Sequence, residues 1–403
     1  MELFWLEHKK LWRKKIVKIC VLLCFVYCVI FGSILSFQWF CFGSSDDYTS
    51  AFGNNFDGYT VIKDSQEYAL SFGGELTDET LQQIVSDYQQ MEADGMEEEL
   101  EKTDWQIVNS WLGTLYPELR DTSNYKTMIS YVDPDKLTGF YERRQQVLDE
   151  FLEVSGQVGA EKEYLHQIER KVEKPFRYEW VEGWSTLLGS MVADLGVVMA
   201  LFLGIVLSSL FAGEWHDNTS TLVLTTRNGW GKIALAKILT GFAFTVELFA
   251  LLAVSSIISQ LFFMGTAGWD MPIQNIKLIA VAPMNMLQAE IYEYAFVLLG
   301  AIGFAGIVMF ISAAVKNNVL TLLLSLAVVY GPMMIAEYLP YGMQKALDLI
   351  PLVGSSTDIF RTNTFRIFGK LIWSPYLLIT IPVLMGILCM PFAIRSWSRR
   401  MKA

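Results

Sequence analysis

Acidic side chains stand inside two of the long apolar stretches of this sequence. Asp194 lies about two turns inside one stretch, and Glu247 lies near the middle of another. Charged side chains in a bilayer are costly, and those that occur commonly line a substrate path or pair with a neighbouring helix. Each residue also has a plainer interpretation, as a protonated or hydrogen-bonded packing residue. Asp194 and Glu247 are therefore candidate translocation-path residues, with both interpretations open.

A proline inside a third apolar stretch gives a second kind of candidate. It stands in the sequence Tyr330-Gly331-Pro332. Proline removes one helical hydrogen bond and clashes with the preceding turn, so a kink is expected there. The kink either shapes a translocation path, in which case Tyr330 and Pro332 line it, or is an ordinary irregularity of a membrane helix.

Motifs of enzymes and metal sites do not occur in the sequence. There are three histidines and no HExxH pair, which argues against a zinc protease. Gly229-Trp230-Gly231-Lys232 lacks the spacing and the Ser/Thr of a phosphate-binding loop. The acidic stretch 92–101 lacks EF-hand spacing, and the five cysteines all lie in apolar runs without a CxxC. We predict no catalytic residue, no metal site and no cofactor bound by this chain.

The elements that must position the candidate residues are hydrophobic helices. Hydrophobic residues make up 53% of the 403 residues and charged residues 18%, against about 25% charged in soluble proteins. An apolar helix of about 20 residues crosses a hydrocarbon core of about 30 Å. Six stretches qualify: residues 19–40, 187–211, 233–263, 294–315, 319–338 and 376–397. The predicted fold class is an α-helical polytopic membrane protein with six transmembrane helices, five of them within residues 187–397.

Residues 1–18 predict an amphipathic helix on the membrane surface. Phe4, Trp5 and Trp12 share one side at helical spacing, and lysines and an arginine occupy the other. Such a helix favours the anionic cytoplasmic surface, and the positive-inside rule then places the N-terminus in the cytoplasm. Six crossings return the basic C-terminus to the same side, which makes the chain a multi-pass protein with both termini cytoplasmic.

Residues 43–182 predict an extracellular α+β domain inserted between the first two spans. They hold about 30 of the 42 acidic residues and about 12 of the 31 basic ones, while the remainder is net basic. Neither part has the charge pattern of a nucleic-acid binder. Alternating residues near the start predict one or two strands. Thr77 predicts the N-cap of a helix running to about Gln90, and a helical stretch at 137–174 is expected to break near 156–159.

Residues 339–375, between the last two spans, predict a broken, semi-apolar segment. Prolines and glycines interrupt it at Pro340, Gly342, Pro351 and Gly354. Irregular backbone at membrane depth needs protein or water around it to satisfy its polar groups. We expect short helices at the outer interface or a partly re-entrant segment.

The segment from Leu210 to Lys237 carries the pattern most informative about function. A span ends at Glu214, a small polar turn and a short apolar helix follow, and Lys237 stands in the next span after an Arg-Asn-Gly-Trp break. This order resembles the coupling segment of ABC type-two exporter permeases, which has a glutamate, a Gly-Thr pair, a short helix ending in a basic residue and a lysine in the next span. Asn218-Thr219 stands here in place of the Gly-Thr pair.

Other parts of the chain resemble the same family in order and placement. The opening amphipathic helix is similar to its interfacial helix, and segment 339–375 is similar to its outer re-entrant helices. A large domain after the first span is similar to that of one mainly bacterial subgroup, in placement and size alone. The ordered combination carries the resemblance.

The resemblance implies a dimeric permease in a bacterial cell membrane, paired with a second copy or homologue. A separate ABC ATPase on the cytoplasmic side would bind ATP and magnesium. A coupling segment at 212–232, with the lysine beyond it, would contact that ATPase. The implied coupling residues are Glu214, Thr219, Thr221, Arg227 and Lys237. Glu214 also has a plainer interpretation, as a charge at the membrane boundary.

Two functions follow as expectations. The first is the transmembrane subunit of an ATP-driven exporter that moves a substrate, such as a peptide or a drug-like molecule, out of the cell. The second is an ABC-linked surface receptor or mechanotransmitter that signals through its extracellular domain without transport. The number of spans separates them, because mechanotransmitter permeases usually have four.

Overall fold

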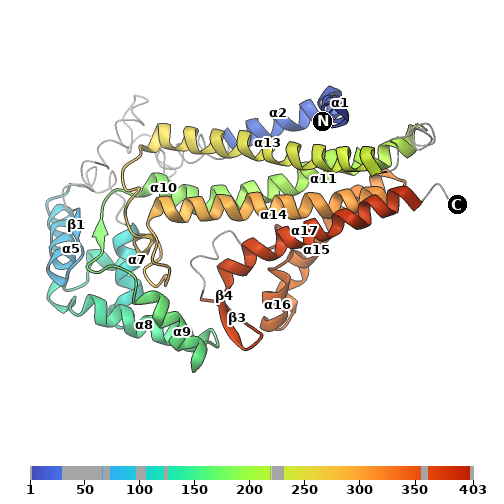
Figure 1. Cartoon of the computed structure of the whole chain (residues 1–403). Helices are drawn as coiled ribbons and strands as arrows, with labels where there is room; N and C mark the ends of the chain where they lie inside the picture. Colours follow the sequence, from blue (N-terminus) through green and yellow to red (C-terminus); the bar gives the residue numbers. More distant parts are fainter. Residues whose placement is uncertain are drawn as a thin grey trace.

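The computed structural model describes residues 2–29, 66, 73–96, 106–121, 126–217, 219, 231–354 and 362–399. Long helices form a bundle, and a smaller domain lies at one end of it (Figure 1). Among the described residues, five helical runs are long and apolar enough to cross a membrane: Glu182–His216, Gly231–Phe262, Met286–Ala314, Asn318–Tyr338 and Ser374–Ser398. The chain is therefore a mostly helical, multi-pass membrane protein, while the sixth span and the orientation stay predictions.

The helices of the bundle match the five later predicted spans, with longer bounds at several ends. They are α10 (Glu182–Thr186), the π-helical turn η5 (Leu187–Met191), α11 (Val192–His216), α13 (Gly231–Met264), α14 (Met286–Ala314), α15 (Asn318–Ile335) with the 3₁₀ turn η7 (Ala336–Tyr338), and α17 (Ser374–Arg399). The largest difference is α14, which begins at Met286 rather than at 294. Its start is fixed by a capping box in which the Asn285 side chain accepts from the Gln288 amide and the Gln288 side chain accepts from the Asn285 amide.

Helices α14 and α17 approach each other so closely that only glycine fits at their contact. A Cβ on Gly303 would lie 2.3 Å from the Pro382 carbonyl oxygen, and one on Gly306 would lie 2.5 Å from that of Gly386. Between membrane helices, where lipid tails are as apolar as side chains, close backbone packing of small residues is a main source of association. These glycines therefore hold α17 against the centre of the bundle.

Substitution of Gly306 with valine is expected to force α14 and α17 apart. Overpacking of a tight core costs about 1–3 kcal/mol. We expect a lower thermal unfolding midpoint of the purified protein and a smaller monodisperse fraction in detergent. The matched control is Gly196→Val in α11, where an added Cβ meets no atom within 4 Å. Equal midpoints for the two variants would show that the close approach does not stabilise the bundle.

Two short helices precede the bundle. Helix α1 (Glu2–Arg13) and helix α2 (Lys15–Val29) divide at Lys14, four residues before the predicted boundary between the surface helix and the first span. The break occurs where the basic cluster meets the apolar run. Helix α1 packs against α13, and α2 packs against α13 and α11. Residues 30–40 of the predicted first span lie outside the described residues.

The smaller domain, called here the inserted domain, comprises the described residues of 73–181. Its helices are α5 (Asp78–Ala93), α7 (Gln106–Leu115), α8 (Phe140–Val154) and α9 (Ala160–Glu169), with 3₁₀ turns η2 (Pro117–Leu119), η3 (Met128–Ser130) and η4 (Pro134–Lys136). Strands β1 (Gly74–Glu75) and β2 (Arg177–Tyr178) form one antiparallel pair. The predicted N-cap is confirmed, since the Thr77 hydroxyl oxygen accepts from the Thr80 amide at 3.2 Å. The predicted break is also confirmed, because α8 ends and α9 begins on either side of 155–159.

The broken segment 339–375 contains one short helix and a hairpin. Helix α16 spans Tyr341–Leu347, and strands β3 (Thr364–Ile367) and β4 (Lys370–Trp373) pair antiparallel. The hairpin reaches the inserted domain, where the Thr364 hydroxyl donates to Gln157 Oε1 at 2.8 Å and Arg366 lies 2.7 Å from Glu161 Oε1. The short helix agrees with the sequence; the hairpin was not expected. Residues 355–361 lie outside the described residues.

A hydrophobic cluster joins the inserted domain to the bundle. It combines Leu148, Leu152 and Leu165 of α8 and α9 with side chains from α10, the α13–α14 connection, the start of α14 and Trp373. The inserted domain is therefore packed on the ends of the helices rather than attached by linkers alone.

Candidate functional site

A network of charged side chains, two of them buried, lies where α1 crosses the ends of α11 and α13, at the end of the bundle away from the inserted domain (Figure 1). Glu214 lies two residues before the end of α11 and Lys237 lies in the second turn of α13. Their side chains are 4% and 2% exposed. Glu214 Oε1 lies 2.8 Å from Lys237 Nζ and 2.6 Å from Lys10 Nζ, and Lys237 Nζ lies 2.8 Å from Glu7 Oε2. We call these four residues the charge network.

The charge network is balanced, with two carboxylates and two ammonium groups. An isolated charge at such low exposure would be strongly destabilising, whereas a paired and hydrogen-bonded one is tolerated. Burial alone would lower the pKa of Lys10, but the hydrogen bond and charge of Glu214, with Glu7, outweigh burial and raise that pKa. Lys10 therefore stays charged when it enters the network.

A third lysine, Lys14, lies at the edge of the same network. Its ammonium donates to Ser209 Oγ at 3.0 Å. Burial, together with the charges of Lys237 and Lys10, lowers its pKa. This end of the bundle is thus rich in positive charge close to the predicted cytoplasmic surface.

Thr219 connects the charge network to the segment that follows α11. Its hydroxyl donates to Glu214 Oε2, and its amide donates to the Glu214 carbonyl at 3.0 Å. The Thr219 side chain itself is exposed. The network therefore fixes the direction in which the chain leaves α11. Thr221, Arg227 and the rest of 220–230 lie outside the described residues, so their coupling roles stay predictions.

Glu247 does not join the charge network. Its side chain is 44% exposed and lies against α1, with His8 Nε2 at 3.2 Å and the Trp12 indole donating at 3.0 Å. Trp12 also packs edge-on against Phe244 of α13. Glu247 thus contacts a neighbouring helix through two polar side chains, and its place on a translocation path stays a prediction.

Asp194, Tyr330 and Pro332 lie on two other helices. Asp194 is exposed on α11, and the Tyr330 hydroxyl of α15 donates to the Val197 carbonyl of α11 at 3.2 Å. Pro332 lies inside α15, whose helical run continues to Ile335. Glu247 faces α1, whereas these three lie on α11 and α15, so a shared path through all four stays a prediction.

Two buried glutamates lie before residue 294, where the apolar pattern predicts the start of this span, so that pattern does not identify them. Glu290 and Glu293 lie in the first two turns of α14 and are 3% and 0% exposed. Gln260 of α13 is also buried, at 1% exposure. The Asn285-x-x-Gln288 capping signal would have placed both glutamates inside the helix.

No group of three or more His, Cys, Asp or Glu side chains in the described part of the chain is arranged to hold a metal ion. In the charge network each carboxylate is paired with a lysine, and these pairs join α1, α11 and α13. Comparison of the chain with protein-family models, curated proteins and solved structures finds no match in any of the three.

Proposed function

We propose that this chain is the membrane-spanning permease subunit of an ATP-driven ABC exporter in a bacterial cell membrane. The observation that carries the proposal is the charge network, in which Glu214 near the end of one span, Lys237 in the next and α1 are bound together. Segment 220–230 joins these two spans in the sequence. A push on that segment would pass through Thr219 and Glu214 to three helices at once. Rigid elements with a shared polar joint are suited to such transmission.

The proposal assigns ATP and magnesium to a separate ATPase subunit and the membrane path to this chain and a second permease copy. Because Glu214 is buried among Lys10, Lys237 and Thr219, its proposed role is to hold segment 220–230. Direct contact with the ATPase then falls to residues of the segment, Arg227 among them.

Affinity purification from the native membrane tests the proposal. A separately encoded ABC ATPase is expected with the wild type and is expected to be depleted about tenfold or more with Arg227→Glu, because an interface charge is reversed. The control is Lys277→Glu, an exposed lysine in the α13–α14 connection at the opposite end of the bundle. Absence of any ATPase from the wild-type complex would overturn the proposal. Equal recovery with both variants would leave the exporter and remove Arg227 from the coupling site.

A receptor or mechanotransmitter is the second candidate, and one feature favours it. The inserted domain is bound to the α13–α14 connection by hydrogen bonds, including a buried one from Trp111 Nε1 to the Asn275 carbonyl at 3.2 Å and a partly buried one from Asn275 Nδ2 to the Arg177 carbonyl at 2.9 Å. Movement of α13 and α14 would therefore move the domain. ATP-dependent uptake of a labelled substrate by inverted vesicles distinguishes the two, since only the exporter accumulates it.

A further inference from the structure

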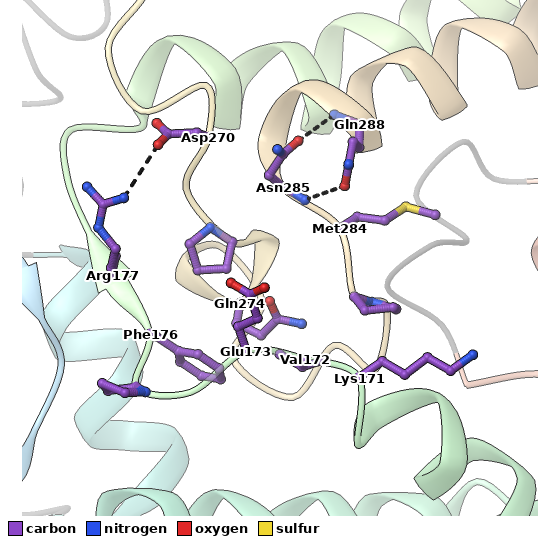
Figure 2. A pocket seen from close by; sticks show the side chains of 13 residues that line it. Lys171, Val172, Glu173, Phe176, Arg177, Asp270, Gln274, Met284, Asn285 and Gln288 are labelled. Carbon is purple, nitrogen blue, oxygen red and sulfur yellow. Dashed lines mark hydrogen bonds and ion pairs between the residues drawn. The ribbon is translucent and has the colours of Figure 1, made fainter.

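Two hollows of the surface differ in the chemistry of their lining. A cavity of about 330 Å³ between the inserted domain and the α13–α14 connection is lined mainly by polar residues. Figure 2 shows that four of these residues bond in pairs, Arg177 with Asp270 and Asn285 with Gln288. A groove of about 550 Å³ between α1 and α13 is by contrast apolar. Its lining suits a hydrocarbon chain, because apolar surface gains free energy when it is removed from water.

The lining of the groove forms a regular stripe along the beginning of α13. The lining positions on this helix recur every three or four residues, so they share one face. Small side chains, Ala236 and Ala243, alternate there with Leu235 and Leu239, which are each 48% exposed. The first turn of α1 forms the other wall. The full lining is Leu3, Phe4, Lys232, Leu235, Ala236, Leu239 and Ala243.

The stripe has the depth of one leaflet of a bilayer. From Lys232 to Ala243 it extends about 16 Å along the helix, at about 1.5 Å per residue. The hydrocarbon core of a membrane is about 30 Å thick, so each leaflet supplies about half of that. Lys232 is the second residue of the span Gly231–Phe262. The groove therefore runs from one membrane surface to about the middle of the bilayer, the depth that an acyl chain of one leaflet fills.

Lys232 places a positive charge at the surface end of the groove. It is exposed, and among the described residues its ammonium makes no ion pair or hydrogen bond. A lysine at the end of a membrane helix lays its stem along apolar surface and extends its ammonium to the level of the headgroups. Helix α1 also carries exposed basic residues, Lys9 and Arg13. This end of the groove therefore attracts an anionic headgroup.

We propose that the groove between α1 and α13 holds one acyl chain of an anionic phospholipid, whose phosphate group pairs with Lys232. A zwitterionic phosphatidylcholine also fits by shape, but its positive choline group offsets the attraction of its phosphate to the lysine. A stripe one helix face wide, with a cation at one end, matches an amphiphile with an anionic end better than it matches a helix of a second copy.

The position of the groove gives lipid binding a structural consequence. The acyl chain contacts both walls and so holds the first turn of α1 against α13. Glu7, one turn after Leu3, is the residue through which α1 reaches Lys237 Nζ at 2.8 Å. The lipid therefore supports the α1 side of the charge network. This inference does not depend on an ATPase and holds for exporter and receptor alike.

The test uses the full chain in phosphatidylcholine nanodiscs that contain a small fraction of a photoreactive lipid. Two probes are compared, phosphatidylglycerol and phosphatidylcholine, each with a diazirine on one acyl chain, and mass spectrometry maps the labelled residues. The reference surface is the exposed face of α15 at Leu323 and Leu324, since α15 begins at the same end of the bundle as α13. Lys316, which precedes that helix, already lies over the Trp215 ring at 4.6 Å.

The expected result is an enrichment of the anionic probe in the groove. The ratio of phosphatidylglycerol to phosphatidylcholine labelling at Leu235 and Leu239 should be about fivefold higher than on the reference surface, the factor for one lysine beside an anionic headgroup. Equal ratios on the two surfaces would overturn the proposal. A groove that neither probe labels, beside a labelled reference surface, would also overturn it, because protein would then cover the groove.

Two substitutions separate the charge of the groove from its shape. Lys232→Met keeps the apolar stem without the charge, so the labelling ratio should fall to that of the reference surface. Ala243→Leu narrows the deep end, so labelling of Leu239 by both probes should fall. The matched control is Lys18→Met, since Lys18 is an exposed lysine of α2 that does not line the groove, and it should leave the ratio unchanged. A ratio unaffected by Lys232→Met, an equal fall in Lys18→Met, or labelling unaffected by Ala243→Leu would each overturn the proposal.

Discussion

Replacement of Lys237 with methionine is expected to lower the free energy of unfolding by about 3–5 kcal/mol, the usual cost of removing one partner from a buried ion pair. The change leaves Glu214, at 4% exposure, with Lys10 as its one charged partner in the described charge network, and it leaves Glu7 without its contact to α13. Methionine matches the length and apolar stem of lysine, so the packing is largely kept. The decrease in the free energy of unfolding is therefore due mainly to removal of the charge.

The same substitution at Lys232 provides the control. Lys232 lies five residues earlier on α13 and is exposed, so Lys232→Met should change stability little. Thermal unfolding of purified protein in one detergent compares the two variants directly. Glu214→Gln combined with Lys237→Met should recover part of the stability, because it removes the buried carboxylate that has lost one of its two cationic partners. A Lys237→Met variant as stable as Lys232→Met would mean that the network does not hold the three helices together.

Half of the charge network could be predicted from the sequence. Glu214 lies near the end of one helix and Lys237 near the start of the next, and consecutive membrane helices joined by a short segment bring such ends together. Lys10 and Glu7 could not be assigned as their partners, because they lie 204 and 230 residues away along the chain and the apolar pattern of α1 fits a membrane surface as well as a helix surface. The pattern showed that α1 has an apolar face without showing what covers it.

The membrane-spanning helices could be predicted from local sequence, but the contacts between them could not. Twenty apolar residues predict a span on composition alone, but Gly303 and Gly306 are significant only because α17 approaches them. The junction between the inserted domain and the bundle could not be predicted from the sequence. Arg144 looks like a surface residue of an amphipathic helix, yet its guanidinium is fully buried against carbonyls more than 130 residues away.

Arg144 is the polar centre of the junction between the inserted domain and the bundle. Its Nε donates to the Leu278 carbonyl at 2.7 Å, Nη2 to the Ala280 carbonyl at 3.1 Å, and Nη1 to Glu169 Oε1 at 2.6 Å. Its guanidinium also lies 5.0 Å from the centre of the Phe176 ring. One planar side chain thus binds a carboxylate of α9 and two carbonyls of the α13–α14 connection, a fork that lysine cannot reproduce.

Replacement of Arg144 with methionine is expected to cost about 3–5 kcal/mol of stability. It leaves Glu169 buried with one cation fewer and the Leu278 carbonyl without its side-chain donor, while the Ala280 carbonyl keeps only the bond from Gln274 Nε2. The local readout is hydrogen exchange of residues 270–285, which should quicken because the connection loses its attachment to α8. Arg170→Met is the matched control, for Arg170 is 68% exposed and its contact with Glu163 spans 3.4 Å. Unchanged exchange in Arg144→Met would show that the shared apolar cluster alone holds the junction.

The same site gives the junction a defined response to acid. Burial would raise the pKa of Glu169, but Lys174 and Arg144 outweigh burial and lower it below its ordinary value of 4.5. A carboxyl whose pKa is lower in the folded state stabilises that state above its unfolded pKa, and this contribution is lost as pH falls from about 4.5 through the lowered value. Wild type should therefore lose stability below about pH 4.5. At pH 7, Glu169→Gln should have a lower free energy of unfolding than wild type, because glutamine carries no charge to pair with Arg144 and Lys174. It should lose less of that free energy on acidification, because glutamine has no carboxylate that can be protonated. A Glu169→Gln variant with the same acid dependence as wild type would assign that dependence to other carboxylates.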